Sequence, residues 1–489
     1  MLAVSPSRAS DLDLRSWPMS STAPAAPVGA PRRARVLAAA ALALAVPFTG
    51  AVTLRATRPA PAFPAEWDPR IIELVRFVEH DRGLEFAHPV HVDYQREAEF
   101  VAGLREGDRD TGPDSSFDQF ARAIGLAEGD VDLAREAVEL AEVGVAAYYS
   151  PKSQRIRVRG TDIDVGQRVI LVHELTHALQ DQQFGLRDIL DDAAEGRIYD
   201  PRALIEGDAS IVERHYVDTL SPEQRREYDD AVESDREAAD FERFPTFLLL
   251  TFDFPYSIGR GFVGALRADG GRTAVDAAFE RLPASDRMAM DPLSYRDPPE
   301  PVRLEPFGAV SPGNRIDSGG TWGAFDLYLM LAEQIDPPEA LTAVLGWGAG
   351  QYRVIDSVVD RTCVELAVRG DDRAATTALE QALARWQKLL PHRDLVRVTR
   401  SAAQVNVRAC DPGTNATGAV SGQVEEAYTL LVIRLGLIEG LAGAADVDLE
   451  AATCVADRVL ADHEPDGFTR NDVDVGLRRS VDAALEVCR

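Results

Sequence analysis

Three residues in the first half of the chain have types and spacing that suit metal chemistry. His173, Glu174 and His177 form the pattern H-E-x-x-H. Residues four apart lie on one face of a helix, so both imidazoles would point the same way. Such a pair can bind one Zn²⁺, and the neighbouring carboxylate of Glu174 can take a proton from water. The spacing predicts a zinc site with an adjacent general base. The alternative is an amphipathic helix with two incidental histidines.

A buried helix is expected to carry this pattern. Residues 169–172 are all apolar, and Leu175, Ala178 and Leu179 continue an apolar face beyond the first histidine. Asp164 is the predicted N-cap of this helix.

A second predicted helix offers a third ligand. Asp200 and Pro201 suit a helix start, with Asp as N-cap and Pro at the first position. Glu206 follows within this helix, and its carboxylate is the best candidate for the oxygen ligand that two histidines lack. The alternative is an ordinary exposed glutamate, which is the usual fate of this residue type.

A hairpin is predicted immediately before the H-E-x-x-H helix. Residues 145–159 contain two alternating runs around a Ser-Pro-Lys-Ser turn. The edge of such a hairpin is a surface against which an extended peptide can lie.

These segments resemble a known class of proteins. The run V-H-E-L-T-H-A-L-Q-D-Q at residues 172–182, with E-G-D-A at residues 206–209, resembles the gluzincin class of zinc metallopeptidases. More narrowly, the H-E-L-T-H-A-L-Q-D-Q core is similar to a group of exported bacterial proteins. The resemblance implies a zincin-like domain over roughly residues 65–410. It also implies His173, His177 and Glu206 as metal ligands and Glu174 as general base.

The sequence departs from the gluzincin pattern in its supporting residues. Thermolysin-like gluzincins place an aspartate four residues after the glutamate ligand, where this chain has Ser210. Asp181, one turn beyond His177, is the expected substitute for orienting a histidine. Tyr256 and His215 are the candidates for stabilising an oxyanion.

We therefore expect a zinc-dependent peptidase that hydrolyses a peptide or protein substrate. The alternative is a non-catalytic, extracytoplasmic zinc-containing binding or scaffold protein. A further alternative places the function in the C-terminal helices, as a module that docks a partner. The net charge of −28 argues against nucleic acid or an anionic membrane surface as partner. No feature of the sequence indicates an oligomeric state.

The N-terminal segment predicts export. Residues 1–31 have a disordered composition, and residues 32–64 contain arginines, an apolar run at 36–54 and a Pro- and Ala-rich linker. The apolar run is either a signal peptide or a single membrane anchor. In both cases the arginines keep the N-terminal side in the cytoplasm, so the body is secreted or lies on the extracellular side of the membrane.

The overall prediction is an α+β, mostly helical protein with a small edge hairpin or sheet before the H-E-x-x-H helix. The metallopeptidase-like domain ends near residue 410, a linker spans residues 411–424, and a helical module spans residues 425–489. Further predicted elements are a helix at 258–266, a buried helix opening at 318–325, strands at 354–367 and 395–410, and a helix at 374–388.

An even number of cysteines in an exported protein suggests two disulfides. Cys363–Cys410 and Cys454–Cys488 are the favoured pairs among three pairings.

Overall fold

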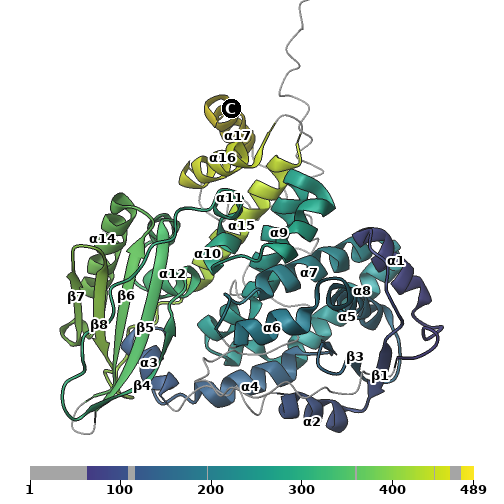
Figure 1. Ribbon diagram of the computed structural model, residues 1–489, viewed down its shortest axis with the longest axis horizontal. Coiled ribbons are helices and arrows are strands. Elements are labelled where there is room, and N and C mark those ends of the chain that lie inside the picture. The colour runs from purple at the N-terminus through teal and green to yellow at the C-terminus, as the bar shows by residue number, and fades with distance from the viewer. Residues whose placement is uncertain are drawn as a thin grey trace, which may run out of the picture.

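The computed structural model describes residues 63–107, 116–194, 196–357, 361–444, 447–462 and 475–488 (Figure 1). The predicted disordered segment and the signal or anchor run lie outside these residues. Within them the fold is α+β and mostly helical, with two small sheets, which confirms the predicted class. No helix of the described part is long and apolar enough to cross a membrane.

The N-terminal lobe contains a three-stranded sheet in the order β1-β3-β2. Strand β1 (His91–Gln95) runs parallel to β3 (Arg155–Arg159), and β2 (Ala147–Ser150) pairs with β3 in antiparallel register. The predicted hairpin is confirmed, and β2 forms one edge of the sheet. Apolar residues of this sheet share one buried cluster with α1 (Ile72–Arg82), α5 (Val165–Phe184) and α7 (Arg202–Thr219).

Helix α5 carries the H-E-x-x-H pattern. Asp164 accepts a hydrogen bond from the backbone N–H of Gln167 at 2.8 Å, as expected for an N-cap. The helix ends at Gly185, which has the left-handed conformation that glycine adopts without penalty. Helix α7 begins one position later than expected. Pro201 is its N-cap residue, while Asp200 accepts from the backbone N–H of Arg202.

Helix α9 (Thr246–Glu280) is longer than the predicted segment and includes it. Its backbone leaves helical geometry at Gly271, and Pro255 is tolerated inside it. Helices α7 and α9 cross in close backbone contact: a Cβ placed on Gly207 would lie 2.2 Å from the carbonyl oxygen of Gly259. Only glycine fits at this crossing.

The second sheet is antiparallel, with the order β4-β5-β6-β8-β7. Its strands are β4 (Asn314–Thr321), β5 (Trp347–Ser357), β6 (Cys363–Gly370), β7 (Val396–Arg400) and β8 (Val405–Cys410). It lies on the side of the molecule opposite α1 and the first sheet (Figure 1). Residues 318–321, expected to open a helix, instead complete β4, and helix α12 (Ala324–Ala332) begins after them. Helix α14 (Arg373–Leu389) packs on this sheet.

The C-terminal helices are α15 (Val424–Ala442), α16 (Leu449–Asp462) and α17 (Val475–Cys488). Helix α15 packs along α9, and the buried apolar cluster of α9 and α12 continues through all three C-terminal helices. The predicted linker at 411–424 therefore does not divide the hydrophobic core.

Both favoured cysteine pairs form disulfides. Cys363 and Cys410 are register partners on β6 and β8, and Cys454 and Cys488 join α16 to α17. Two disulfides indicate a non-reducing, extracellular-type environment.

The remaining elements connect these parts. They are α2 (Glu97–Gly107), α3 (Phe117–Ala123), α4 (Leu133–Gly144), α6 (Leu186–Ala194), α8 (Pro222–Ala239), η3 (Phe241–Arg243), α10 (Asp286–Met290), α11 (Pro292–Arg296), α13 (Pro337–Val344) and η4 (Arg393–Leu395).

Candidate metal centre

Helices α5 and α7 bring His173, His177 and Glu206 together. One ligand atom from each lies within 4.8 Å of the other two, and all three side chains are buried. Glu206 Oε2 lies 3.2 Å from His173 Nε2 and 3.1 Å from His177 Nε2, so one carboxylate oxygen faces both imidazoles. This is the one such group among the described residues.

The separations suit a tetrahedral zinc ion. Zn–N and Zn–O bonds of about 2.0–2.2 Å place neighbouring tetrahedral ligand atoms about 3.3 Å apart. The two N···O distances of 3.1 and 3.2 Å are close to that spacing. Two imidazole nitrogens and one carboxylate oxygen are also the donor set of zinc sites that keep a fourth position for water or substrate. The donor types and these two separations are therefore compatible with a bound metal ion such as zinc.

The other ring nitrogen of each histidine is held by a second residue. His173 Nδ1 lies 3.0 Å from Glu213 Oε2, and His177 Nδ1 lies 2.9 Å from Gln180 Oε1. Both partners are acceptors, so each Nδ1–H donates to its partner and each Nε2 faces Glu206, where a metal would take the place of a proton. Sequence reasoning assigned no role to Glu213 or Gln180, although Glu213 lies two helical turns after Glu206 and Gln180 lies three residues after His177.

The expectation that Asp181 orients a zinc histidine is wrong. Asp181 Oδ2 accepts from the Tyr149 hydroxyl at 2.7 Å, and Oδ1 accepts from the backbone N–H of Arg187 at 3.2 Å. The carboxylate is thus turned toward the hairpin and the end of α5. The carboxylate beside a histidine is instead that of Glu213, next to His173.

Glu174 is buried beside the histidines and accepts a hydrogen bond from the first sheet. The backbone N–H of Tyr149 on β2 donates to Glu174 Oε2 at 2.5 Å. Because β3 lies on the other side of β2, this N–H points from the outer edge of the sheet toward α5. The predicted hairpin and the predicted base therefore meet directly.

Charge in the cluster is distributed unevenly. Burial raises the pKa of Glu174. Burial also acts to raise the pKa of Glu206, but His177 and His173 outweigh it and lower that pKa to about 2. For His173, burial acts to lower the pKa, yet hydrogen bonds to Glu206 and Glu213 raise it well above its usual value. Glu206 is therefore an anion in contact with both histidines, while Glu174 retains a proton more readily than an exposed glutamate.

The two oxyanion candidates have different positions. The Tyr256 ring on α9 lies 6.1 Å, centroid to centroid, from the ring of His173, next to the cluster. His215 lies further along α7, where its Nδ1 is 2.9 Å from Asp81 Oδ1 and its side chain is 38% exposed. The structure thus brings Tyr256 to the site and directs His215 into an ion pair elsewhere.

Arg202 places a positive charge near the histidine cluster. It lies one turn before Glu206 on α7 and pairs with Asp200. Burial acts to lower the pKa of Arg202, but Asp200, together with Tyr256 and Glu206, raises it. This guanidinium remains charged beside the cluster.

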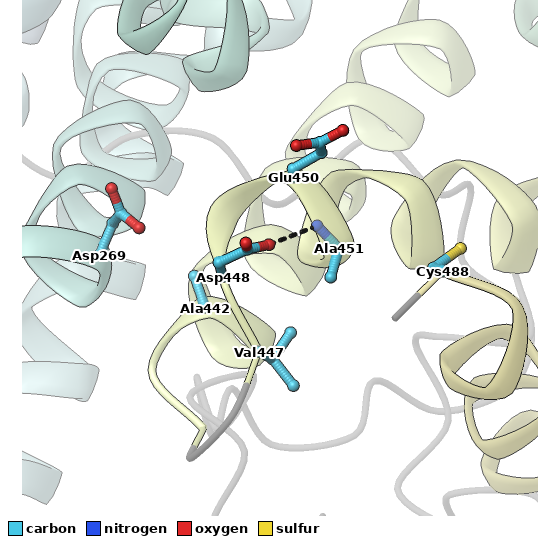
Figure 2. Close-up of a pocket in the computed structure, with 7 residues that line it drawn as sticks. All are labelled: Asp269, Ala442, Val447, Asp448, Glu450, Ala451 and Cys488. Atoms are coloured by element: carbon cyan, nitrogen blue, oxygen red, sulfur yellow. Dashed lines mark hydrogen bonds between the residues drawn. The ribbon is translucent and has the colours of Figure 1, made fainter.

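A hollow lies elsewhere on the molecule, between the part of α9 that carries Asp269 and the C-terminal helices (Figure 2). Its lining includes Asp269, Asp448 and Glu450, but Asp448 caps α16 by accepting from the backbone N–H of Ala451 at 2.9 Å. No residue of the histidine cluster lines it. This hollow is therefore separate from the candidate metal centre.

No protein-family model, no curated protein and no solved structure matches this chain. The function must accordingly be argued from the residues themselves.

Proposed function

We propose that the protein is a zinc-dependent peptidase in which His173, His177 and Glu206 bind the metal and Glu174 is the general base. The observation that carries this proposal is the contact between Glu174 and the edge strand. A carboxylate outside the candidate ligand group is buried beside it and accepts a hydrogen bond from the backbone N–H of Tyr149. A purely structural zinc site does not require such a group.

The chemistry is hydrolysis of an amide bond. When bound, zinc polarises the scissile carbonyl and lowers the pKa of water. Glu174 takes one proton from the attacking water, whose oxygen forms a bond to the carbonyl carbon. Glu174 then gives that proton to the amide nitrogen as the C–N bond breaks, which leaves a carboxylic acid and an amine. Tyr256 is the candidate donor to the developing oxyanion.

The edge of β2 is the proposed binding surface for substrate. An extended peptide can add to a sheet edge through main-chain hydrogen bonds. Tyr149 lies on this edge and contacts Glu174, so a peptide bound there would run past the base. A peptide or protein is therefore the proposed substrate class.

The proposed location is outside the cytoplasm. The two disulfides support a non-reducing compartment, and the basic and apolar composition of residues 32–54 supports export. Secretion and retention by an uncleaved anchor are the two forms of this proposal.

The test is Glu174→Gln, which keeps the size and one acceptor of this side chain but removes the base. Zinc content should stay at one ion per chain, while hydrolysis of a mixed peptide library falls by at least about a thousandfold. Glu227→Gln, on the exposed face of α8, is the matched control and should change neither quantity. Retained hydrolysis in Glu174→Gln would contradict the mechanism. Stoichiometric zinc with no hydrolysis by the wild type would favour the binding or scaffold alternative.

A further inference from the structure

Gln180 on α5 makes three hydrogen bonds in the protein interior. Its Oε1 lies 2.9 Å from His177 Nδ1, while its Nε2 donates to Asp208 Oδ2 at 2.8 Å and to the carbonyl oxygen of Ile205 at 3.1 Å. The side chain is 1% exposed. Gln180 therefore links the second candidate zinc ligand to two positions on α7.

The chemistry of the partners fixes the orientation of this amide. Asp208 and the Ile205 carbonyl can only accept, so the NH₂ group must face them. The amide oxygen then faces His177 and can only accept from Nδ1–H. A flipped amide would place two donors or two acceptors against each other at both ends. The imidazole is thus held with Nδ1–H toward Gln180 and Nε2 toward Glu206, which makes Nε2 the atom that would bind the metal.

A buried ion pair holds Asp208 in turn. Arg82, the last residue of α1, donates from Nε to Asp208 Oδ2 at 3.0 Å and from Nη2 to Asp276 Oδ1 at 2.7 Å. The Arg82 and Asp208 side chains are each 1% exposed, so both charges have lost most of their hydration.

This pair is poorly suited to a purely stabilising role. A buried ion pair gains little over well-packed apolar residues once desolvation is counted. Arg82 Nη1 and Asp208 Oδ1 also have no hydrogen-bond partner among the described residues. What the pair does provide is a fixed acceptor for the Gln180 NH₂ group.

We propose that Gln180 is a positioning residue for the metal centre, and that Asp208 and Arg82 fix its orientation. Through this chain, the docking of α1 on α7 sets the affinity of His177 for zinc. The inference rests on the metal site of the proposed function and is independent of peptide hydrolysis.

The first test compares Gln180→Leu with Gln182→Leu on the same helix. Gln182 also bonds to the N-terminal part of the chain, through the backbone of Ala87 and His88, but no hydrogen bond joins it to His173 or His177. Zinc affinity is measured by competition with a chromophoric chelator on protein shown to be folded by circular dichroism. Gln180→Leu should weaken zinc binding by about 10- to 100-fold, and Gln182→Leu should leave it at the wild-type value.

The second test replaces the donor at position 180 with an acceptor. Gln180→Glu places carboxylate oxygens against Asp208 Oδ2 and the Ile205 carbonyl oxygen, and should weaken zinc binding. The visible absorption of the Co²⁺-loaded protein should shift in Gln180→Glu and Gln180→Leu and stay at the wild-type position in Gln182→Leu.

The outcomes distinguish a failure of the proposed function from a failure of the positioning role of Gln180. Wild-type protein that binds no zinc would contradict the proposed function itself. If the wild type binds zinc, an equal affinity in Gln180→Leu or an unchanged Co²⁺ spectrum in Gln180→Glu would overturn the positioning role alone.

Discussion

Gly207 on α7 and Gly259 on α9 lie in direct backbone contact. A Cβ on Gly207 would be 2.2 Å from the Gly259 carbonyl oxygen, and a Cβ on Gly259 would be 2.2 Å from the Ala203 carbonyl oxygen. Glu206 precedes the first glycine, and Tyr256 lies one turn before the second. The crossing therefore places a metal-ligand candidate and an oxyanion candidate at the same site.

Gly259→Ala should disturb both stability and metal binding. The neighbouring atoms are backbone and cannot move without separating the helices, so a loss of about 1–3 kcal/mol or more is expected. Zinc affinity should fall as well, because Glu206 moves with α7. Gly308→Ala is the control, since that glycine is exposed and nothing lies within 4 Å of its added Cβ. Urea unfolding measures the change in stability, and zinc competition measures the change in affinity. Wild-type values of both in Gly259→Ala would contradict the close crossing.

Metal removal should lower the melting temperature. Without a cation, Glu174, Glu206 and Glu213 remain buried together around two histidines. A ligand present at about 1,000 times its dissociation constant stabilises the native state by about 4 kcal/mol. Dialysis against 1,10-phenanthroline should therefore decrease Tm, and added zinc should restore it. His177→Ala should show no zinc-dependent change; a Tm shift of wild-type size in that variant would place the metal elsewhere.

The Cys363–Cys410 disulfide should stabilise the second sheet without affecting the metal. It closes a segment with a sequence separation of 47, for which the chain-entropy model gives about 4 kcal/mol. The double substitution C363A/C410A should lower Tm in oxidising buffer and leave zinc stoichiometry at one. Loss of zinc in this folded variant would show that the sheet supports the centre more directly than its position suggests.

The contact between His215 and Asp81 should make the free energy of unfolding depend on pH in the acid range. Burial acts to raise the pKa of Asp81, but His215 and Arg267 lower it to about 2 from the usual 3.8. A lowered carboxyl pKa contributes stability that is fully present above about pH 4 and is lost as pH falls through about 2. Asp81→Asn should thus cost about 1 kcal/mol at pH 7, allowing for screening, and this difference should vanish near pH 2.

Urea unfolding of both proteins from pH 2 to 7 measures this difference. His215→Ala should retain full peptide hydrolysis, because the ring is engaged with Asp81. A large loss of kcat in that variant would return His215 to the catalytic candidates.

The local features of the site could be predicted because each depends on short spacing. The histidine pair, the Asp164 cap and the hairpin are all set by neighbours in sequence. The favoured cysteine pairs were also the correct ones. The first three features each depend on residues that are close in sequence. The cysteine pairs could be predicted because four cysteines allow only three pairings.

The supporting contacts could not be predicted because they depend on how helices pack. Arg82 and Asp208 are 126 positions apart, and only the docking of α1 on α7 brings them together. Asp181 has the spacing to orient a histidine but is drawn away by the Tyr149 hydroxyl. Residues 318–321 lack strand alternation and are held in β4 by pairing with β5.

The proposed chemistry requires one zinc ion bound between α5 and α7. Crystals of the zinc-loaded protein, measured on both sides of the zinc absorption edge, test it directly. We expect one strong anomalous peak about 2.0–2.2 Å from His173 Nε2, His177 Nε2 and Glu206 Oε2. An absence of anomalous density there, or a single ordered peak at another site in fully loaded protein, would contradict it.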